Sequence, residues 1–163
     1  MPVEHLVIDD RSGPAPAPWR FFTDAVMGGV SEGRMAGEVV AGRPALCLRG
    51  QVRLENNGGF IQMALPVRPP SGDWQAIELD VFGNGHRYGL HLRTADMELP
   101  WQAWRGTFFA GPAWQTVCLP LADFAPYRST GVLTSGNVRR IGILALGERF
   151  DADVCIARLA WAR

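Results

Sequence analysis

This sequence lacks lysine altogether, so its 16 basic side chains, leaving histidine aside, are all arginine. Catalysis through a lysine Schiff base or a lysine general base is therefore excluded, and a phosphate-binding P-loop would lack its usual lysine. Because arginine stays protonated in proteins, proton transfer would depend on carboxylates, tyrosines, cysteines or the three histidines. Long apolar runs are also missing. None reaches the roughly 18 residues of a membrane-spanning helix, and we expect no membrane span.

Neither sign of charge is in excess, because 16 acidic side chains balance the arginines and the formal net charge is zero. The arginines are spread along the chain rather than gathered in a tail or stripe. This distribution predicts a mixed, solvated surface and no nucleic-acid partner. The N-terminal stretch has neither a basic segment followed by an apolar one nor an arginine-rich amphipathic segment. We therefore expect a soluble protein of the cytoplasm.

Cysteine is scarce, and the three residues present are far apart in the chain. Cys47, Cys118 and Cys155 each lie within an apolar run. Disulfides and zinc sites favour paired spacings, whereas isolated cysteines in apolar runs are typical of buried thiols in a reducing compartment. We expect three buried free thiols.

The length of 163 residues predicts one domain, residues 1–163. With 19 glycines and 12 prolines, the chain is rich in turn residues but keeps plentiful apolar ones. Residues 11–18 contain three of the prolines and are expected to form an extended connector.

Apolar residues alternate with polar ones over most of the chain, which is the period of half-buried strands. Residues 77–81 and 88–92 are the clearest cases, and Asn84-Gly85 between them predicts a tight hairpin turn. Only residues 121–124, after a proline, suggest a helical turn. The fold class we expect is all-β, an antiparallel jelly-roll sandwich. The other expected strands are residues 5–9, 45–52, 59–65, 107–110, 114–119, 139–145 and 153–161.

A serine hydrolase is a remote alternative for the function. Residues 29–33 match the G-x-S-x-G pattern around Ser31, and acids and histidines follow it in the chain. That pattern requires a helix directly after the serine. Residues 34–42 are too rich in glycine and β-branched residues for such a helix, so we expect no catalytic residue and no enzyme.

Metal and cofactor sites have little support. Asp9 with Asp10, and Asp151 with Asp153, could contribute to a structural calcium site, but calcium takes six or more oxygen ligands. His86 and His91 lack an evident third ligand for zinc. We expect no cofactor and leave calcium as the one alternative.

Two groups of residues are candidates for ligand binding. Arg87, His91 and Arg93 alternate with apolar residues of the same strand and should project away from the core. Trp101, Gln102 and Trp104 lie next to Arg105 in a polar, loop-like stretch, where they could stack on a sugar or anchor a partner.

Two glycine-rich stretches, DAVMGGVS at residues 24–31 and LENNGGF at residues 54–60, are the most unusual parts of the sequence. Paired glycines beside short polar side chains suit bulges and close backbone approach, and the polar side chains can cap exposed backbone groups. We expect these residues to form a structural motif: Asp24, Met27, Gly28, Gly29, Ser31, Asn56, Asn57, Gly58 and Gly59.

These stretches, together with GNGHRYGLHLR at residues 83–93 and WQTVCLPLADF at residues 114–124, resemble the complex I intermediate-associated protein 30 family over residues 19–161. The resemblance implies a galactose-binding-like jelly roll. Eukaryotic members act as assembly factors, or chaperones, for NADH:ubiquinone oxidoreductase. It therefore implies a non-enzymatic binding module with a protein partner, such as a respiratory-complex subunit. The alternative is a carbohydrate-binding module that uses the concave face of a sheet.

Overall fold

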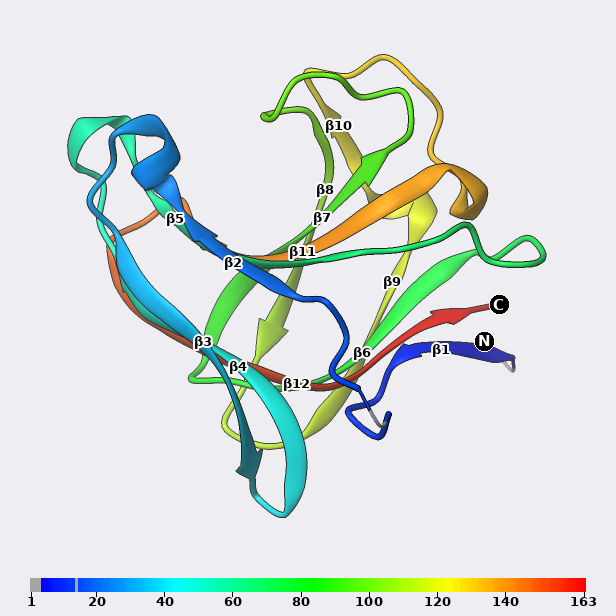
Figure 1. Cartoon of the computed structure of the whole chain (residues 1–163), viewed down its shortest axis with the longest axis horizontal. Coiled ribbons are helices and arrows are strands. Elements are labelled where there is room, and N and C mark those ends of the chain that lie inside the picture. Colours follow the sequence, from blue (N-terminus) through cyan, green and yellow to red (C-terminus); the bar gives the residue numbers. More distant parts are fainter. Residues whose placement is uncertain (1–3, 14) are drawn as a thin grey trace.

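The chain folds into two antiparallel β-sheets, which face each other as a sandwich (Figure 1). The computed structural model describes residues 4–13 and 15–163. The first sheet has the order β3 (Glu32–Val40), β4 (Arg43–Val52), β12 (Phe150–Ala162), β6 (Ala76–Phe82) and β9 (Gln115–Pro120), and β1 (His5–Asp9) also pairs with β12. The second sheet has the order β10 (Ala125–Tyr127), β8 (Ala103–Ala110), β7 (His86–Thr94), β11 (Val138–Leu146), β5 (Phe60–Pro66) and β2 (Arg20–Thr23).

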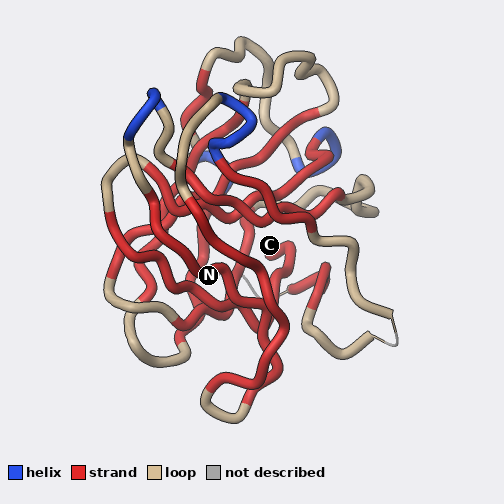
Figure 2. The backbone as a smooth tube through the Cα atoms, turned by 60° about the vertical axis from the view of Figure 1, so that its left-hand side comes forward, coloured by secondary structure: helices blue, strands red, loops and turns tan. Residues whose placement is uncertain are grey.

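Helices among the described residues are single short turns, as Figure 2 shows. They are η1 (Asp24–Met27), η2 (Glu55–Asn57), η3 (Leu121–Asp123) and η4 (Ser135–Asn137). In the described part of the chain, no helix has the length and apolar character that crossing a membrane requires.

The alternating pattern produces the core. Ile77, Leu79 and Val81 of the first sheet are fully buried, and Leu90 and Leu92 of the second sheet meet them from the other side. Because successive side chains of a strand point to opposite faces, the intervening residues lie on the outer faces of the sandwich. The predicted jelly-roll sandwich is confirmed.

Every strand expected from the sequence is present. Strands β2, β3 and β10 are present as well but were not predicted from the sequence. Strand β3 contains Gly33 and Gly37, which weaken the strand signal. Gly33 lies opposite Gly50 of β4, and a side chain at Gly50 would clash with the backbone of Glu32. The glycines therefore allow β3 and β4 to approach closely at this point.

The hairpin predicted at Asn84-Gly85 is wrong. Strands β6 and β7 belong to different sheets, so this turn carries the chain across the end of the sandwich. Gly85 does adopt a positive φ of 85°. The Asn84 side chain donates to the Asp151 backbone oxygen at 2.9 Å and accepts from the Tyr88 hydroxyl at 2.6 Å. The turn is therefore fixed by β7 and β12 rather than by pairing of its own two strands.

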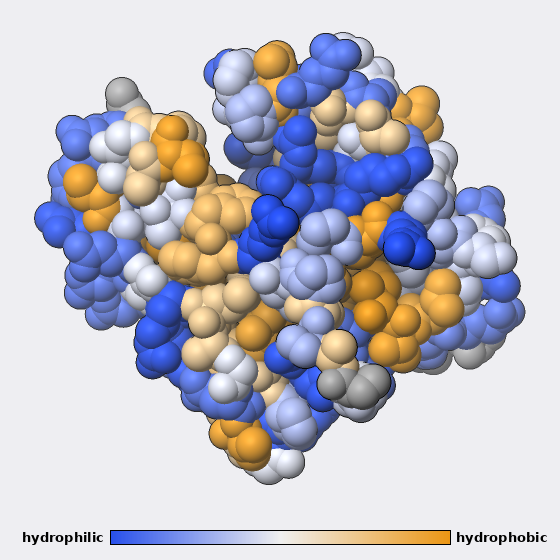
Figure 3. Space-filling view, viewed as in Figure 1, coloured by the Kyte–Doolittle hydropathy of each residue, from blue (hydrophilic) through white to orange (hydrophobic). Residues whose placement is uncertain are grey.

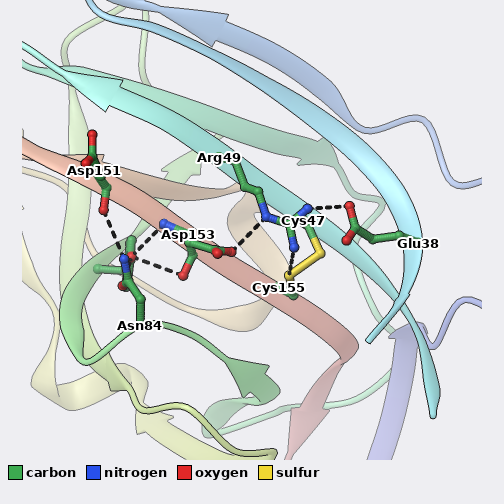
Figure 4. Close-up of polar contacts among 8 residues, drawn as sticks. Glu38, Cys47, Arg49, Asn84, Asp151, Asp153 and Cys155 are labelled. Atoms are coloured by element: carbon green, nitrogen blue, oxygen red, sulfur yellow. Dashed lines mark hydrogen bonds and ion pairs between the residues drawn. A yellow bond between two sulfur atoms is a disulfide. The ribbon is translucent and has the colours of Figure 1, made fainter. Parts of the chain in front are cut away.

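The prediction of three buried free thiols is also wrong. Cys47 of β4 and Cys155 of β12 lie directly opposite each other and form a disulfide (Figure 4). Their separation of 108 residues conceals this pairing in the sequence. Cys118 remains free but is exposed, because it lies on the outer face of β9. Partial loss of hydration, and secondarily the charge of Glu78, raises the pKa of the Cys118 thiol.

Arg49 joins the strands around this disulfide. Its guanidinium donates to Asp153 at 3.0 Å and to Glu38, and another of its nitrogens lies 3.7 Å from the Cys155 sulfur (Figure 4). The three neighbouring strands β3, β4 and β12 are thus linked by side chains as well as by their backbone ladders.

We predict that replacing both Cys47 and Cys155 with alanine lowers the free energy of unfolding by about 2–4 kcal/mol, because the disulfide closes a long loop of the unfolded chain. Denaturant unfolding measures this loss. Non-reducing peptide mapping should recover the Cys47–Cys155 link with Cys118 free. Cys118→Ala is the matched control and should leave stability unchanged. Equal stability of the double variant and the control would contradict the prediction.

Candidate binding face

The two glycine-rich motifs meet at the buried carboxylate of Asp24. This side chain is fully buried and accepts hydrogen bonds from the backbone and hydroxyl of Ser31 at 3.0 and 2.6 Å. It also accepts from the backbone nitrogens of Gly59 at 2.6 Å and Phe60 at 3.2 Å. Figure 1 shows the η1 and η2 turns that carry the motifs side by side. Residues of both motifs therefore share one acceptor.

Glycines surround this carboxylate because side chains would collide with it. A Cβ at Gly29 would contact Asp24 closely, and one at Gly58 would lie 2.6 Å from its Oδ2 atom. The Asn56 amide donates to the Gly28 carbonyl oxygen at 3.2 Å. Gly28 ends η1 with a φ of 86°. These contacts make both motifs part of the scaffold, whereas the side chain of Met27 is exposed.

Ser31 is not placed as a nucleophile. It is 5% exposed, and its hydroxyl donates to Asp24 and accepts from the Arg53 backbone nitrogen at 2.8 Å. Strand β3 follows it directly, where a nucleophile elbow would require a helix. The hydroxyl therefore serves the Asp24 network.

The other candidate feature is the outer face of the second sheet. The six strands of this sheet contain no aspartate or glutamate. The same strands contain six arginines: Arg20, Arg87, Arg93, Arg105, Arg139 and Arg140. None of the six lies within 4.0 Å of a carboxylate oxygen in the described part of the chain.

The first sheet has the opposite arrangement. Its strands contain seven acidic residues and four arginines, and most of these arginines are paired. Arg43 lies 2.8 Å from Asp80, and Arg158 lies 2.9 Å from Glu78. The evenly mixed surface predicted from the sequence is therefore wrong, because folding sorts the charges by sheet.

The side chains of His91, Arg105 and Arg140 lie together at the centre of the outer face. His91 of β7 lies opposite Arg105 of β8. Arg140 is on the neighbouring strand β11, opposite Arg93 of β7. Burial, followed by the charges of Arg105 and Arg140, lowers the pKa of His91 to about 4. At neutral pH the histidine is therefore uncharged and can accept as well as donate a hydrogen bond.

Small residues form the floor beside these side chains. Gly89, Gly142 and Ala64 occupy outer-face positions and are buried. A Cβ at Gly142 would lie 2.7 Å from the Gln62 amide nitrogen, so that amide lies across the floor. In Figure 3 hydrophilic residues gather along the right-hand side of the notch above this sheet, between the η1–η2 lobe and the loops at the top right.

Gln62 is the least expected residue on this face. The residue is only 6% exposed, and its amide makes no hydrogen bond with a described residue, yet neither amide atom is among the fully buried polar atoms that lack a partner. The amide therefore keeps some contact with solvent and is open to a ligand.

Two arginines of the face are held by aromatic rings. The Arg105 guanidinium lies 3.4 Å from the centre of the Tyr127 ring, and Arg140 lies 5.2 Å from that of Phe22. Arg128 approaches Tyr127 as well, at 5.4 Å. Stacking restricts the guanidinium groups and covers the aromatic faces.

The residues singled out from the sequence separate into two groups. Arg87 and His91 project from the outer face, as expected. Arg93 also leaves the core, but it donates to the backbone oxygens of Leu99 and Gln102 at 2.8 Å and so holds the β7–β8 loop. The Gln102 side chain supports the same loop by accepting from the Leu99 nitrogen at 2.9 Å.

Trp101 and Trp104 do not form a pair on the surface. Trp101 is 52% exposed, whereas Trp104 lies in β8, opposite Leu92, and packs against the core. The expectation that Trp104 lies in a loop is wrong, because β8 begins at Ala103. Sequence reasoning also missed Arg140 and Gln62. Their alternation with Ile141, Ile61 and Met63 marked them as outward-facing, but only the sheet order brings them together.

The acidic pairs considered for calcium have other partners. Asp9 accepts from the Trp19 indole nitrogen at 2.8 Å and from Arg11 at 3.1 Å, and Asp153 accepts from Arg49. Within residues 4–13 and 15–163, no three histidine, cysteine, aspartate or glutamate side chains gather as metal ligands would. Structural calcium stays an untested prediction.

Comparison with protein-family models identifies the family of this chain. Residues 9–154 match the family model of complex I intermediate-associated protein 30. The chain belongs to this family. A search of curated proteins found no significant match.

Solved structures with the same fold include several carbohydrate-binding modules. The family 11 module of the cellulosomal cellulase Lic26A-Cel5E of Clostridium thermocellum matches with a TM-score of 0.77 and 12% identity, over 98% of this chain and 94% of that one. A family 11 module of the same organism in complex with a β-1,3-1,4-mixed-linked tetrasaccharide matches with a TM-score of 0.76 and 12% identity, over 96% and 94%. The family 30 module of Cel9D-Cel44B matches with a TM-score of 0.68 and 14% identity, over 98% and 97%. At these identities the likeness establishes the fold.

We predict that Asp24→Asn lowers the free energy of unfolding by roughly 2–4 kcal/mol, because hydrogen bonds to a charged group contribute about 1.5–3 kcal/mol each and an amide nitrogen would face backbone donors. Burial raises the pKa of Asp24, but the hydrogen bonds from Ser31, Gly59 and Phe60 outweigh it and hold the pKa below the usual 3.8. The stabilisation is therefore present above pH 3.8 and is lost as the pH falls through the lower folded value.

Urea unfolding of the Asp24 variant between pH 7 and pH 2.5 tests this, with Asp123→Asn as the control because Asp123 is an exposed aspartate in η3. A variant that kept the stability of the wild type at pH 7 would refute the role of Asp24.

We also predict that stability declines as the pH falls from 6.5 toward 4. In this window the unfolded chain binds a proton at His91 that the folded protein does not, since its folded pKa is about 4. His91→Gln should flatten the decline in unfolding experiments at pH 7, 6, 5 and 4.5. His86→Gln removes a histidine from the start of the same strand and is the matched control. An unchanged slope in the His91 variant would contradict the prediction.

Proposed function

We propose that this chain is a non-catalytic binding module that engages a protein partner through the outer face of its second sheet. The observation that carries the proposal is that Arg105, Arg140, a neutral histidine and a side-chain amide converge on this face without a carboxylate partner among the described residues. The family name concerns complex I intermediates. In keeping with it, we propose a subunit or assembly intermediate of a respiratory complex as the partner.

The arrangement of side chains supports binding rather than catalysis. His91 has no carboxylate to orient it, since the strands of its sheet contain none, and Ser31 is buried in the Asp24 network. General acid–base or nucleophilic chemistry requires such groups within hydrogen-bond reach of each other. We propose that the module needs no cofactor.

A carbohydrate on the same face is the second candidate. It is supported by the fold shared with a module that was solved with a tetrasaccharide, and by the exposed ring of Trp101. Of the other aromatic rings here, Phe22 and Tyr127 are covered by arginines, whereas Phe109 of β8 is 46% exposed. The two covered rings offer less surface for stacking on a neutral sugar.

The expectation of a cytoplasmic location rested partly on three free thiols. The Cys47–Cys155 disulfide removes that support, because disulfides persist mainly in oxidising compartments. We therefore propose that the module acts in an oxidising compartment.

We predict that Thr107→Trp abolishes capture of the partner. Thr107 is exposed on the outer face of β8, opposite Gly89, so a large ring there would cover the floor without changing the charge. Affinity capture from native lysate with quantitative mass spectrometry, comparing wild type and variant, measures the effect.

The matched control is Val39→Trp, which adds a ring at a site that is 71% exposed on β3 of the first sheet. Proteins captured by the wild type and the control but not by Thr107→Trp support the proposal. If the wild type recovers no protein above background, or both variants retain it, the proposed function fails.

A further inference from the structure

We propose that the outer face of the second sheet recognises carboxylate groups, and that its ligand is an acidic polypeptide segment of the partner. The proposal rests on the proposed function and names the chemistry of the contact. Arg105, Arg140, His91 and Gln62, from the four neighbouring strands β8, β11, β7 and β5, form what we call the carboxylate site.

The first argument is charge complementarity. In a chain of zero net charge, the first sheet holds seven acidic residues, whereas the strands of the second sheet hold none. Arg105 and Arg140 therefore meet no carboxylate within 4.0 Å among the described residues. An acidic ligand would supply the missing counter-charges.

The second argument is that the guanidinium donors of Arg105 and Arg140 are held in position before a ligand binds. Tyr127 and Phe22 hold the two guanidinium groups by stacking, which leaves their nitrogen edges free. The Nε atom of Arg105 is buried without a partner in the described part of the chain. Because a guanidinium binds a carboxylate with two parallel hydrogen bonds, an arginine held in this way loses little freedom on binding.

The third argument is the amide of Gln62. The residue is more than nine-tenths buried, but its amide lies over Gly142, makes no hydrogen bond with a described residue and keeps some contact with solvent. Gly142 in turn lies opposite His91. An amide donor and a neutral imidazole beside two arginines can satisfy the oxygens of a carboxylate and an adjacent peptide group.

The fourth argument is that the site is costly without a ligand. Burial, and secondarily Arg93, lowers the pKa of Arg140, and burial followed by Arg105 and Arg140 lowers that of His91. Like charges held together without a counter-ion destabilise the folded protein. Such a cost at a surface cluster is typical of residues kept for binding.

Polypeptide fits better than the other sources of negative charge. An apolar group borders the cations: Phe109 of β8 is 46% exposed and lies opposite Arg87. A polypeptide offers acidic and apolar side chains together. Nucleic-acid-binding domains usually carry a net positive charge, whereas this chain has a formal net charge of zero.

The experiment uses a fluorescein-labelled peptide of eight glutamates and its eight-glutamine counterpart, with anisotropy read at low salt and at 0.5 M NaCl. The glutamate peptide should bind the full chain, lose affinity at high salt, and bind at least tenfold more weakly to the Arg105→Gln/Arg140→Gln variant. Arg34→Gln is the matched control because Arg34 is an exposed arginine on β3, and it should keep the wild-type affinity.

Three results would overturn the proposal: no binding of the glutamate peptide, equal binding of the glutamine peptide, or equal losses in the double variant and the control. Tighter, arginine-dependent binding of a tri-galacturonate or of a neutral mixed-linked tetrasaccharide would replace the polypeptide with a saccharide. If Thr107→Trp abolishes partner capture while the double arginine variant retains it, the proposed function stands and the carboxylate site fails.

The stability of the variants separates binding from a structural role. Arg140→Gln should melt at the same temperature as the wild type or higher, because it removes like-charge repulsion. A melting temperature lowered by several degrees would show that Arg140 supports the fold, and would overturn its assignment to the site.

Discussion

The buried carboxylate of Asp24 is the interaction on which this end of the molecule depends. Asp24 follows β2 of the second sheet, while Ser31 leads into β3 of the first. Gly59 directly precedes β5 of the second sheet, which begins at Phe60. The Ser31 hydroxyl extends the network to the backbone of Arg53, directly after β4. One acceptor thus fixes the loops where the chain passes between sheets. The glycines around it exist because nothing larger fits beside the carboxylate.

The scaffold and the candidate site use charge in opposite ways. In the first sheet most arginines are paired with acidic residues, and Arg49 joins three strands through Glu38 and Asp153. In the second sheet Arg105 and Arg140 are half-buried on the outer face, have no counter-ions among the described residues and are held by aromatic rings. Paired charges contribute to the fold, whereas unpaired ones cost stability and remain available to a ligand. The same residue type therefore serves both roles in a protein without lysine.

Much of the fold was accessible from the sequence, because the alternation of apolar and polar residues reports directly on burial. That pattern located β6, β7 and β11, and it placed His91 and Arg87 on the outer face. It failed where local signals were weak, as in the glycine-containing β3, and where a local signal was strong but misleading. Asn84-Gly85 has the chemistry of a hairpin turn, yet its flanking strands pair with β12 and β11 rather than with each other.

The sequence by itself determined the fold class, the family, the lack of lysine chemistry and the identity of the two glycine-rich motifs, because these depend on residue type and short spacing. Only the tertiary structure decided which residues become neighbours. It joined Cys47 to Cys155 across 108 residues, gathered Arg105, Arg140 and Gln62 beside His91, and turned Trp104 toward the core. The physical reason is that alternation fixes the side of a strand on which a residue lies, whereas strand order and register fix what it meets.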